Sequence, residues 1–187
     1  MERLQDGGRV LDVGCGVGRV GVAIAKAFPK CEVVGLDPDP ESIRKARETA
    51  ANAGMGDRIH FVEKTTHDFD GDGGFDLITA CDCVHDFSAP QRTLGEIRNL
   101  LKPEGTLFIV EPKAADRLED NMNPIAGMYY GFSLFHCMTQ SLADGGPGLG
   151  TCMGPASMEK LLHEAGFAHI EKLDIRSQTN LFYVATQ

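Results

Sequence analysis

The chain has 187 residues, of which 42% are hydrophobic and 24% are charged, close to the averages of globular proteins. This composition excludes a disordered tail, a fibre and a collagen-like repeat, and the length favours a single domain over residues 1–187. A formal net charge of −9 repels polyanions, so we expect no nucleic acid partner. No apolar stretch reaches the roughly 20 residues that cross a bilayer, and the first residues lack a secretory pattern. We therefore expect a cytoplasmic protein without membrane attachment.

Short β-rich runs alternate with helical patterns along most of the chain. The predicted strands are 9–13, 32–36, 58–62, 75–80 and 105–111, and the predicted helices are 17–28, 41–53 and 90–101. Residues 113–154 break this pattern and predict an insertion or lid. A helix over 155–165 and two closing strands, 169–175 and 180–185, follow. This order predicts an α/β fold with a mostly parallel, doubly wound sheet that ends in a hairpin.

A glycine-rich loop, Asp12-Val-Gly14-Cys-Gly16-Val-Gly18, lies between the first predicted strand and the first predicted helix. Glycine lets the backbone approach a ligand, and a helix N-terminus offers free N–H groups, so the loop predicts a nucleotide-like ligand. The stretch that begins at Gly16 also matches G-x-G-x-x-G, and Asp37 follows about 20 residues later, as in a dinucleotide fingerprint. The pattern alone therefore fits both S-adenosylmethionine and NAD.

Two features favour S-adenosylmethionine over NAD. The carboxylate of Asp12, two residues before Gly14, suits a ligand with a sulfonium and an ammonium group and would repel a pyrophosphate. The closing helix and hairpin leave no second mononucleotide half for a nicotinamide. Asp37 can accept hydrogen bonds from ribose hydroxyls of either ligand, so it does not discriminate between them.

The stretch Arg9-Val-Leu-Asp-Val-Gly-Cys-Gly-Val-Gly18 resembles the first motif of class I S-adenosylmethionine-dependent methyltransferases, and Val33-Val-Gly-Leu-Asp37 resembles their ribose-binding acid. The resemblance spans nearly the whole chain and implies a Rossmann-like seven-stranded sheet in the order 3-2-1-4-5-7-6, with strand seven antiparallel. It implies methyl transfer to an O, N or C atom of a small organic acceptor, with S-adenosylhomocysteine as the product. The cofactor-binding residues that it implies are Asp12, Gly14, Cys15, Gly16, Gly18, Asp37, Pro38, His67, Asp68 and Asp82.

Two further segments, 75–86 and 131–137, resemble a subgroup of these methyltransferases whose catalytic half follows an N-terminal winged-helix domain. Few residues precede the first predicted strand, so we expect that domain to be absent. Either the segment 113–150 or a second copy of the chain is then expected to cover the cofactor. The Met- and aromatic-rich stretch 122–138 suits an apolar substrate, core packing or a homodimer contact.

Two histidines are candidate catalytic residues. His85 follows the fourth predicted strand at the edge where ligands of open α/β sheets bind, and Asp82 or Asp86 is placed to orient its ring as a general base. A histidine that only bonds the loop backbone is the alternative interpretation. His136, in the predicted lid, either reaches the acceptor or simply packs. Glu111, at the end of the fifth strand, is a candidate substrate contact or loop anchor.

No metal site is expected from the cysteine spacing. The six cysteines form no C-x-x-C pair, so we expect reduced thiols and no structural zinc. Cys81 and Cys83 lie near His85, but no second pair of ligands is in view. Two other functions remain as alternatives to methyl transfer. The first is an S-adenosylmethionine-binding partner or regulatory subunit without its own activity, and the second is a nicotinamide oxidoreductase.

Overall fold

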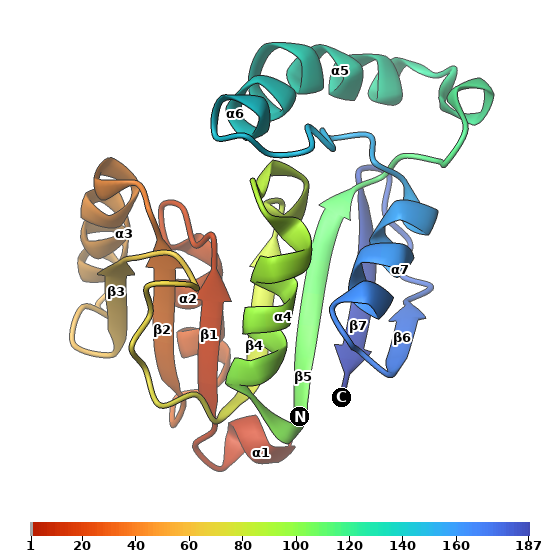
Figure 1. The fold of residues 1–187 in the computed structure, drawn as a ribbon. Coiled ribbons are helices and arrows are strands. Elements are labelled where there is room, and N and C mark those ends of the chain that lie inside the picture. The colour runs from red at the N-terminus through yellow and green to blue at the C-terminus, as the bar shows by residue number, and fades with distance from the viewer. Residues whose placement is uncertain (1) are drawn as a thin grey trace. The chain divides into compact units, whose positions relative to one another are not determined.

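The computed structural model describes residues 2–187, and its strands form one seven-stranded sheet in the order β3-β2-β1-β4-β5-β7-β6 (Figure 1). β1 pairs in parallel with β2 and β4, and β2 pairs in parallel with β3, whereas β6 and β7 are antiparallel. The strands are β1 Arg9–Val13, β2 Glu32–Asp37, β3 Ile59–Glu63, β4 Phe75–Cys81, β5 Leu101–Pro112, β6 His169–Lys172 and β7 Asn180–Thr186. The Rossmann-like α/β sheet implied by the resemblance is thus confirmed.

Four of the helices lie where the hydrophobic patterns predict them, to within two residues. The helices are α1 Glu2–Gln5, α2 Arg19–Ala27, α3 Pro40–Asn52, α4 Pro90–Leu100, α5 Pro124–Phe132, α6 Met138–Ala143 and α7 Pro155–Glu164, with 3₁₀ turns η1 Val84–Asp86 and η2 Leu118–Asn121 and a π-helical turn η3 Ser133–Cys137. The four are α2, α3, α4 and α7, whereas α1, α5 and α6 are not among the predicted helices. Within residues 2–187, every helix is too short or too polar to cross a lipid bilayer.

The chain divides into two compact units. The first unit comprises the residues up to Cys81 together with Asn99–Phe108, and the second comprises Asp82–Arg98 and Ile109–Gln187. β5 therefore begins in the first unit and ends in the second. That the whole chain acts as one domain, with 113–154 as its lid, stays a prediction.

The core of the first unit lies between the sheet and the helices α2 and α3, which pack on β2 and β3. α3 buries Ile43, Ala46 and Ala50, a spacing that places all three on one helix face. They share a hydrophobic cluster with Val22 of α2 and Phe61 of β3. β1 and β2 are almost fully buried, as expected for central parallel strands with both faces covered. This packing fixes the carboxyl ends of β1, β2 and β3.

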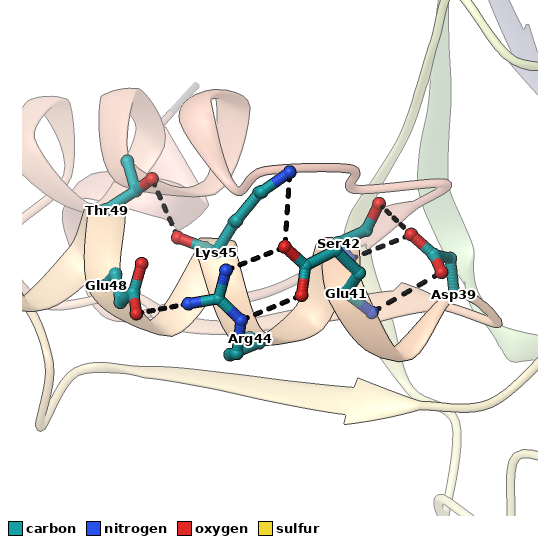
Figure 2. A network of polar contacts seen from close by, with 7 residues as sticks. All are labelled: Asp39, Glu41, Ser42, Arg44, Lys45, Glu48 and Thr49. Carbon is teal, nitrogen blue, oxygen red and sulfur yellow. Dashed lines mark hydrogen bonds and ion pairs between the residues drawn. The ribbon is translucent and has the colours of Figure 1, made fainter.

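Polar side chains determine where α3 begins and line its exposed face (Figure 2). The carboxylate of Asp39 caps the helix: it accepts hydrogen bonds from the backbone N–H and the hydroxyl of Ser42, at 2.9 and 2.7 Å. These bonds hold the pKa of Asp39 below its usual value. Glu41 pairs with Arg44 and Lys45 one turn later, which lowers the pKa of Glu41 to about 2. α3 therefore starts directly after the short turn that follows β2.

In the second unit, the segment 113–154 is mostly helical, because α5, η3 and α6 run on without a break from Pro124 to Ala143 (Figure 1). Asn123 caps this run by accepting a hydrogen bond from the N–H of Ala126 at 3.0 Å. α6 packs against η1, and the hydroxyl of Ser141 donates to the carbonyl oxygen of Phe87 at 3.3 Å. The segment is therefore attached to the loop that carries His85.

Candidate functional site

The loop between β1 and α2 has a backbone that requires glycine. Gly14, Gly16 and Gly18 have φ values of 64°, 50° and 77°, in the left-handed region that other residues rarely adopt. A Cβ atom on Gly18 would lie 2.7 Å from Cζ of Phe61 and 3.0 Å from Cβ of Ala46. A Cβ atom on Gly16 would meet nothing within 4 Å. A side chain at position 18 would therefore clash with its neighbours, whereas the space over Gly16 is open to a ligand.

Asp37, at the end of β2, holds this loop in place. Its Oδ2 accepts a hydrogen bond from the N–H of Gly16 at 2.8 Å, and its Oδ1 accepts one from the N–H of Asp39 at 3.0 Å. The N–H of Cys15 also donates to the carbonyl oxygen of Leu36 at 2.9 Å. A carboxylate can accept roughly four hydrogen bonds, so Asp37 keeps positions for the hydroxyl groups of a ligand.

Asp12 brings a negative charge into the interior beside the loop. It is 1% exposed, and its Oδ1 accepts a hydrogen bond from the hydroxyl of Thr79 at 2.6 Å, while its buried Oδ2 has no hydrogen-bond partner. Burial raises the pKa of Asp12 to about 6, so most of the group is still ionised at neutral pH. Burial and the charges of Asp12 and Asp37 also raise the pKa of the Cys15 thiol. The field at the loop is therefore negative, which suits a cationic ligand and opposes a pyrophosphate.

The other predicted cofactor residues of the first unit follow β2 and β3. These strands are parallel and end at a paired position, Asp37 with Glu63, so the segments that follow them start at the same edge of the sheet. Pro38 comes directly after β2, and His67 and Asp68 lie in a turn after β3; all three are exposed. The carboxylate of Asp68 accepts a hydrogen bond from the hydroxyl of Thr65 at 2.8 Å. Their contact with a cofactor stays a prediction.

In the second unit, His85 is held by a carboxylate of β5. The turn that leads to it begins at Asp82, whose φ of 59° is the one positive value among the non-glycine residues that the structure describes. The N–H of Asp82 donates to the carbonyl oxygen of Val110 at 2.8 Å. His85 is 2% exposed, and its Nδ1 lies 2.6 Å from Oε2 of Glu111. Oε1 of Glu111 accepts a hydrogen bond from the N–H of Val84 at 2.9 Å, so both carboxylate oxygens are used.

The electrostatic environment of His85 favours its protonated form. Burial disfavours the imidazolium, but the hydrogen bond and charge of Glu111 and the charges of Asp86 and Asp82 together raise the pKa of His85 above its usual value. Nε2 lies 3.5 Å from Oδ1 of Asp86. The acid that orients the ring through Nδ1 is therefore Glu111, and Asp86 lies at the opposite nitrogen.

A cavity of about 310 Å³ adjoins His85 within the second unit. Part of its wall is η3, and π-helical turns frequently occur at functional sites. The lining residues are Asp82, His85, Asp86, Pro112, Tyr129, Phe132, His136, Cys137 and Thr151. The structure thus brings the predicted residues His85, His136 and Asp82 to one cavity, whose volume lies at the lower end for small-molecule sites.

Sequence reasoning missed two side chains of this region, Cys137 and Thr151, and the pairing of a third, Glu111, with His85. It treated Glu111 as a substrate contact or loop anchor, although the buried positions of β5, Leu107 and Ile109 among them, alternate and place Glu111 on the inward side. Cys137 and Thr151 are joined by a hydrogen bond in which the Thr151 hydroxyl donates to Sγ at 3.1 Å. No local sequence pattern predicts a role for Cys137 or Thr151, because they share a cavity with His85 only in the folded chain.

Comparison with known proteins gives a matching family model and, among the similar proteins, a curated relative and two solved structures. A family model described as a methyltransferase domain matches residues 4–166. The methyltransferase phqN of Penicillium fellutanum is 30% identical over 130 residues, which cover 65% of this chain and 37% of that protein. An O-methyltransferase family protein from Burkholderia thailandensis has a TM-score of 0.76 at 22% identity, over 100% of this chain and 53% of that chain. A structure described as PigF with SAH has a TM-score of 0.71 at 21% identity, over 96% of this chain and 50% of that chain.

The chain thus spans 37% of the length of the Penicillium relative and about half of each of the two solved chains. The two structural likenesses show the fold. Because the family model matches residues 4–166, which is most of the sequence, the protein belongs to the methyltransferase domain family.

Proposed function

We propose that the protein transfers a methyl group from S-adenosylmethionine to a small organic acceptor, with His85 as the general base for an O–H or N–H group. The observation that carries this proposal is the glycine loop, which is tied to Asp37 and open over Gly16. The buried pair of His85 and Glu111 beside a cavity supports it. Membership of the methyltransferase domain family supports the reaction class.

The residues around the loop fit this cofactor. When bound, S-adenosylmethionine supplies a methyl group on a positively charged sulfur, so attack by the acceptor forms the new bond as the carbon–sulfur bond breaks. Asp37 would accept hydrogen bonds from the ribose hydroxyls with its remaining positions. The negative field of Asp12 would favour the cationic end of the ligand. Cys15, Pro38 and His67 would line the cofactor site, and Asp68 would contact the adenine amino group, the role that the resemblance implies for the loop after the third strand.

His85 would take the proton that the acceptor loses. With Nδ1 bonded to Glu111, Nε2 is the nitrogen that receives it, and the carboxylate stabilises the imidazolium that forms. Because the pKa of His85 is raised, its ring is a stronger base than an ordinary histidine, but it acts only when Nε2 is unprotonated. Turnover should therefore rise with pH through the pKa of His85.

The cavity indicates the kind of acceptor. Its volume of about 310 Å³ suits a small molecule, and its lining combines the rings of Tyr129 and Phe132 with the carboxylates of Asp82 and Asp86. His136 is exposed and lines the same cavity, so it is placed to contact the acceptor as well. We infer that the segment 113–154 forms one wall of the acceptor site and so acts as its lid.

The same segment presents apolar side chains to solvent, which supports a homodimer contact. Met122 is 80% exposed and Phe135 is 82% exposed, and Met128, Phe132 and Leu134 are also exposed. Apolar surface of this kind is a common sign of association. Sedimentation velocity should show a dimer for the wild-type chain and a monomer for Phe135→Ser. A monomeric wild-type chain would contradict the dimer.

Titration calorimetry with S-adenosylhomocysteine tests the cofactor assignment. Asp37→Ala should weaken binding by roughly 10- to 100-fold, because it removes hydrogen bonds to a charged group worth about 1.5–3 kcal/mol. Asp39→Asn is the matched control, since it changes a neighbouring exposed acid and keeps a side chain that caps α3. Binding of NADH without binding of S-adenosylhomocysteine would overturn the proposal. Binding without turnover on any acceptor would favour the regulatory subunit.

A further inference from the structure

The cavity beside His85 contains a cluster of potential metal ligands. His85, Asp86 and Cys137 each offer one ligand atom, and these atoms lie within 4.8 Å of one another. His85 and Cys137 are buried, and all three residues line the cavity. Imidazole nitrogen, carboxylate oxygen and thiolate sulfur are the donors that zinc accepts. The cluster contains neither Cys81 nor Cys83, the cysteines that the sequence analysis considered for a metal.

Two independent features point from this cluster to a ligand. Oδ1 of Asp86 is buried without a hydrogen-bond partner, and the same oxygen lies 3.5 Å from Nε2 of His85. A buried oxygen of this kind is costly unless a positive group faces it. In the metal-free chain the protonated ring of His85 faces it, and a bound cation would take that place once Nε2 has lost its proton. The second feature is Glu111, which holds Nδ1 at 2.6 Å. Metal-binding histidines are typically oriented by a carboxylate in this way, which leaves the other nitrogen to face the ion.

The distances are close to those of a zinc site. Zinc bonds of about 2.0–2.3 Å at tetrahedral angles separate the ligand atoms by roughly 3.5 Å. Nε2 of His85 and Oδ1 of Asp86 are already at that separation, and all three ligand atoms lie within 4.8 Å of one another. The hydroxyl of Thr151 donates to Sγ of Cys137 at 3.1 Å, a contact that would also stabilise a thiolate.

We propose that Nε2 of His85, Oδ1 of Asp86 and Sγ of Cys137 bind one divalent ion of the zinc class per chain. Glu111 is the positioning residue of His85, and a fourth coordination position opens to the cavity. Binding releases to solvent the thiol proton of Cys137 and, where the ring of His85 is protonated, the proton on Nε2. The ion occupies the nitrogen that a base requires, so the loaded chain loses its general base; this consequence alone rests on the proposed function.

Cobalt titration of the untagged, reduced full chain tests the site, because Co²⁺ replaces Zn²⁺ and bonds between thiolate and cobalt absorb in the near ultraviolet. The absorption should saturate at one Co²⁺ per chain and disappear when Zn²⁺ is added. Cys137→Ser should abolish it, whereas Cys152→Ser, the matched change of a half-buried thiol in the same unit, should retain it. Glu111→Gln should weaken zinc binding by about 10- to 100-fold.

The outcomes separate this site from the proposed function. No thiolate absorption in the wild-type chain, or equal absorption in Cys137→Ser, would overturn the metal site whatever the cofactor result. Saturable absorption in a chain that does not bind S-adenosylhomocysteine would support the metal site and count against the methyltransferase proposal. Asp86→Asn provides a second variant at a partly exposed position: it should keep the fold by circular dichroism and weaken Zn²⁺ binding, and unchanged affinity would remove Asp86 from the site.

Discussion

The glycine loop of the first unit and the His85 cavity of the second unit are built in different ways. The loop is one continuous stretch, 12–18, and its shape depends on backbone torsions and on the hydrogen bond that the N–H of Gly16 donates to Asp37. The cavity gathers side chains from distant parts of the chain, and even the pair of His85 and Glu111 spans 26 residues. The comparison teaches that a site made of backbone can be identified from local sequence, whereas a site made of side chains depends on packing.

The largest effect is expected at the side-chain site. His85→Ala should lower turnover by roughly 10²- to 10⁴-fold, the usual contribution of a general base, while the affinity for S-adenosylhomocysteine stays nearly unchanged. Glu111→Gln should lower turnover less and move the rise of turnover to lower pH, because Glu111 is the strongest influence that raises the pKa of His85.

The measurement is a pH profile of turnover for the wild-type chain and both variants. His136→Ala is a suitable comparison for His85→Ala, because it removes a second histidine from the same cavity. The ring of His136 is exposed, and the hydrogen bond described for this residue involves its backbone carbonyl rather than a carboxylate. A His85→Ala variant with normal turnover would show that positioning alone accounts for catalysis.

The backbone site should respond to the size of the added side chain. Gly18→Ala should cost about 2–5 kcal/mol in the free energy of unfolding, since overpacking against Phe61 and Ala46 adds to the cost of a left-handed residue. Gly16→Ala faces open space and should cost only about 1–2 kcal/mol. Urea unfolding of the two variants measures the difference, and equal losses would mean that torsion rather than packing dominates at both positions.

The smallest effect is expected at the cap of α3. Asp39→Ala removes the bonds to Ser42 and should lower the melting temperature slightly, while Asp39→Asn should keep most of the stability (Figure 2). The folded pKa of Asp39 is lowered, so its contribution is present above the unfolded pKa of about 3.9 and is lost as pH falls through the folded pKa. Melting curves of the wild type and Asp39→Ala should therefore converge in acid; a constant difference would exclude the carboxylate as its cause.

Much of the fold could be predicted because its signals are local. Apolar runs such as Arg9–Val13, followed by glycines and a helical pattern, indicate strand, loop and helix without knowledge of distant contacts. The pairing of His85 with Glu111 could not be predicted in the same way. The pattern of β5 shows that Glu111 points inward, but it does not show which side chain Glu111 contacts. Cys137 lies still farther along the chain and is recognisable as a neighbour of Asp86 only in three dimensions.

The raised pKa of the Cys15 thiol affects how readily this residue is oxidised. Thiolates, not thiols, react with oxidants and alkylating compounds, so a cysteine whose pKa is raised by burial and by two acids is inert at neutral pH. Its sulfur acts instead as a packing atom, close to the backbone of Gly35. The glycine loop, the proposed cofactor site, thus contains a cysteine that is less open to oxidative damage than an exposed thiol would be.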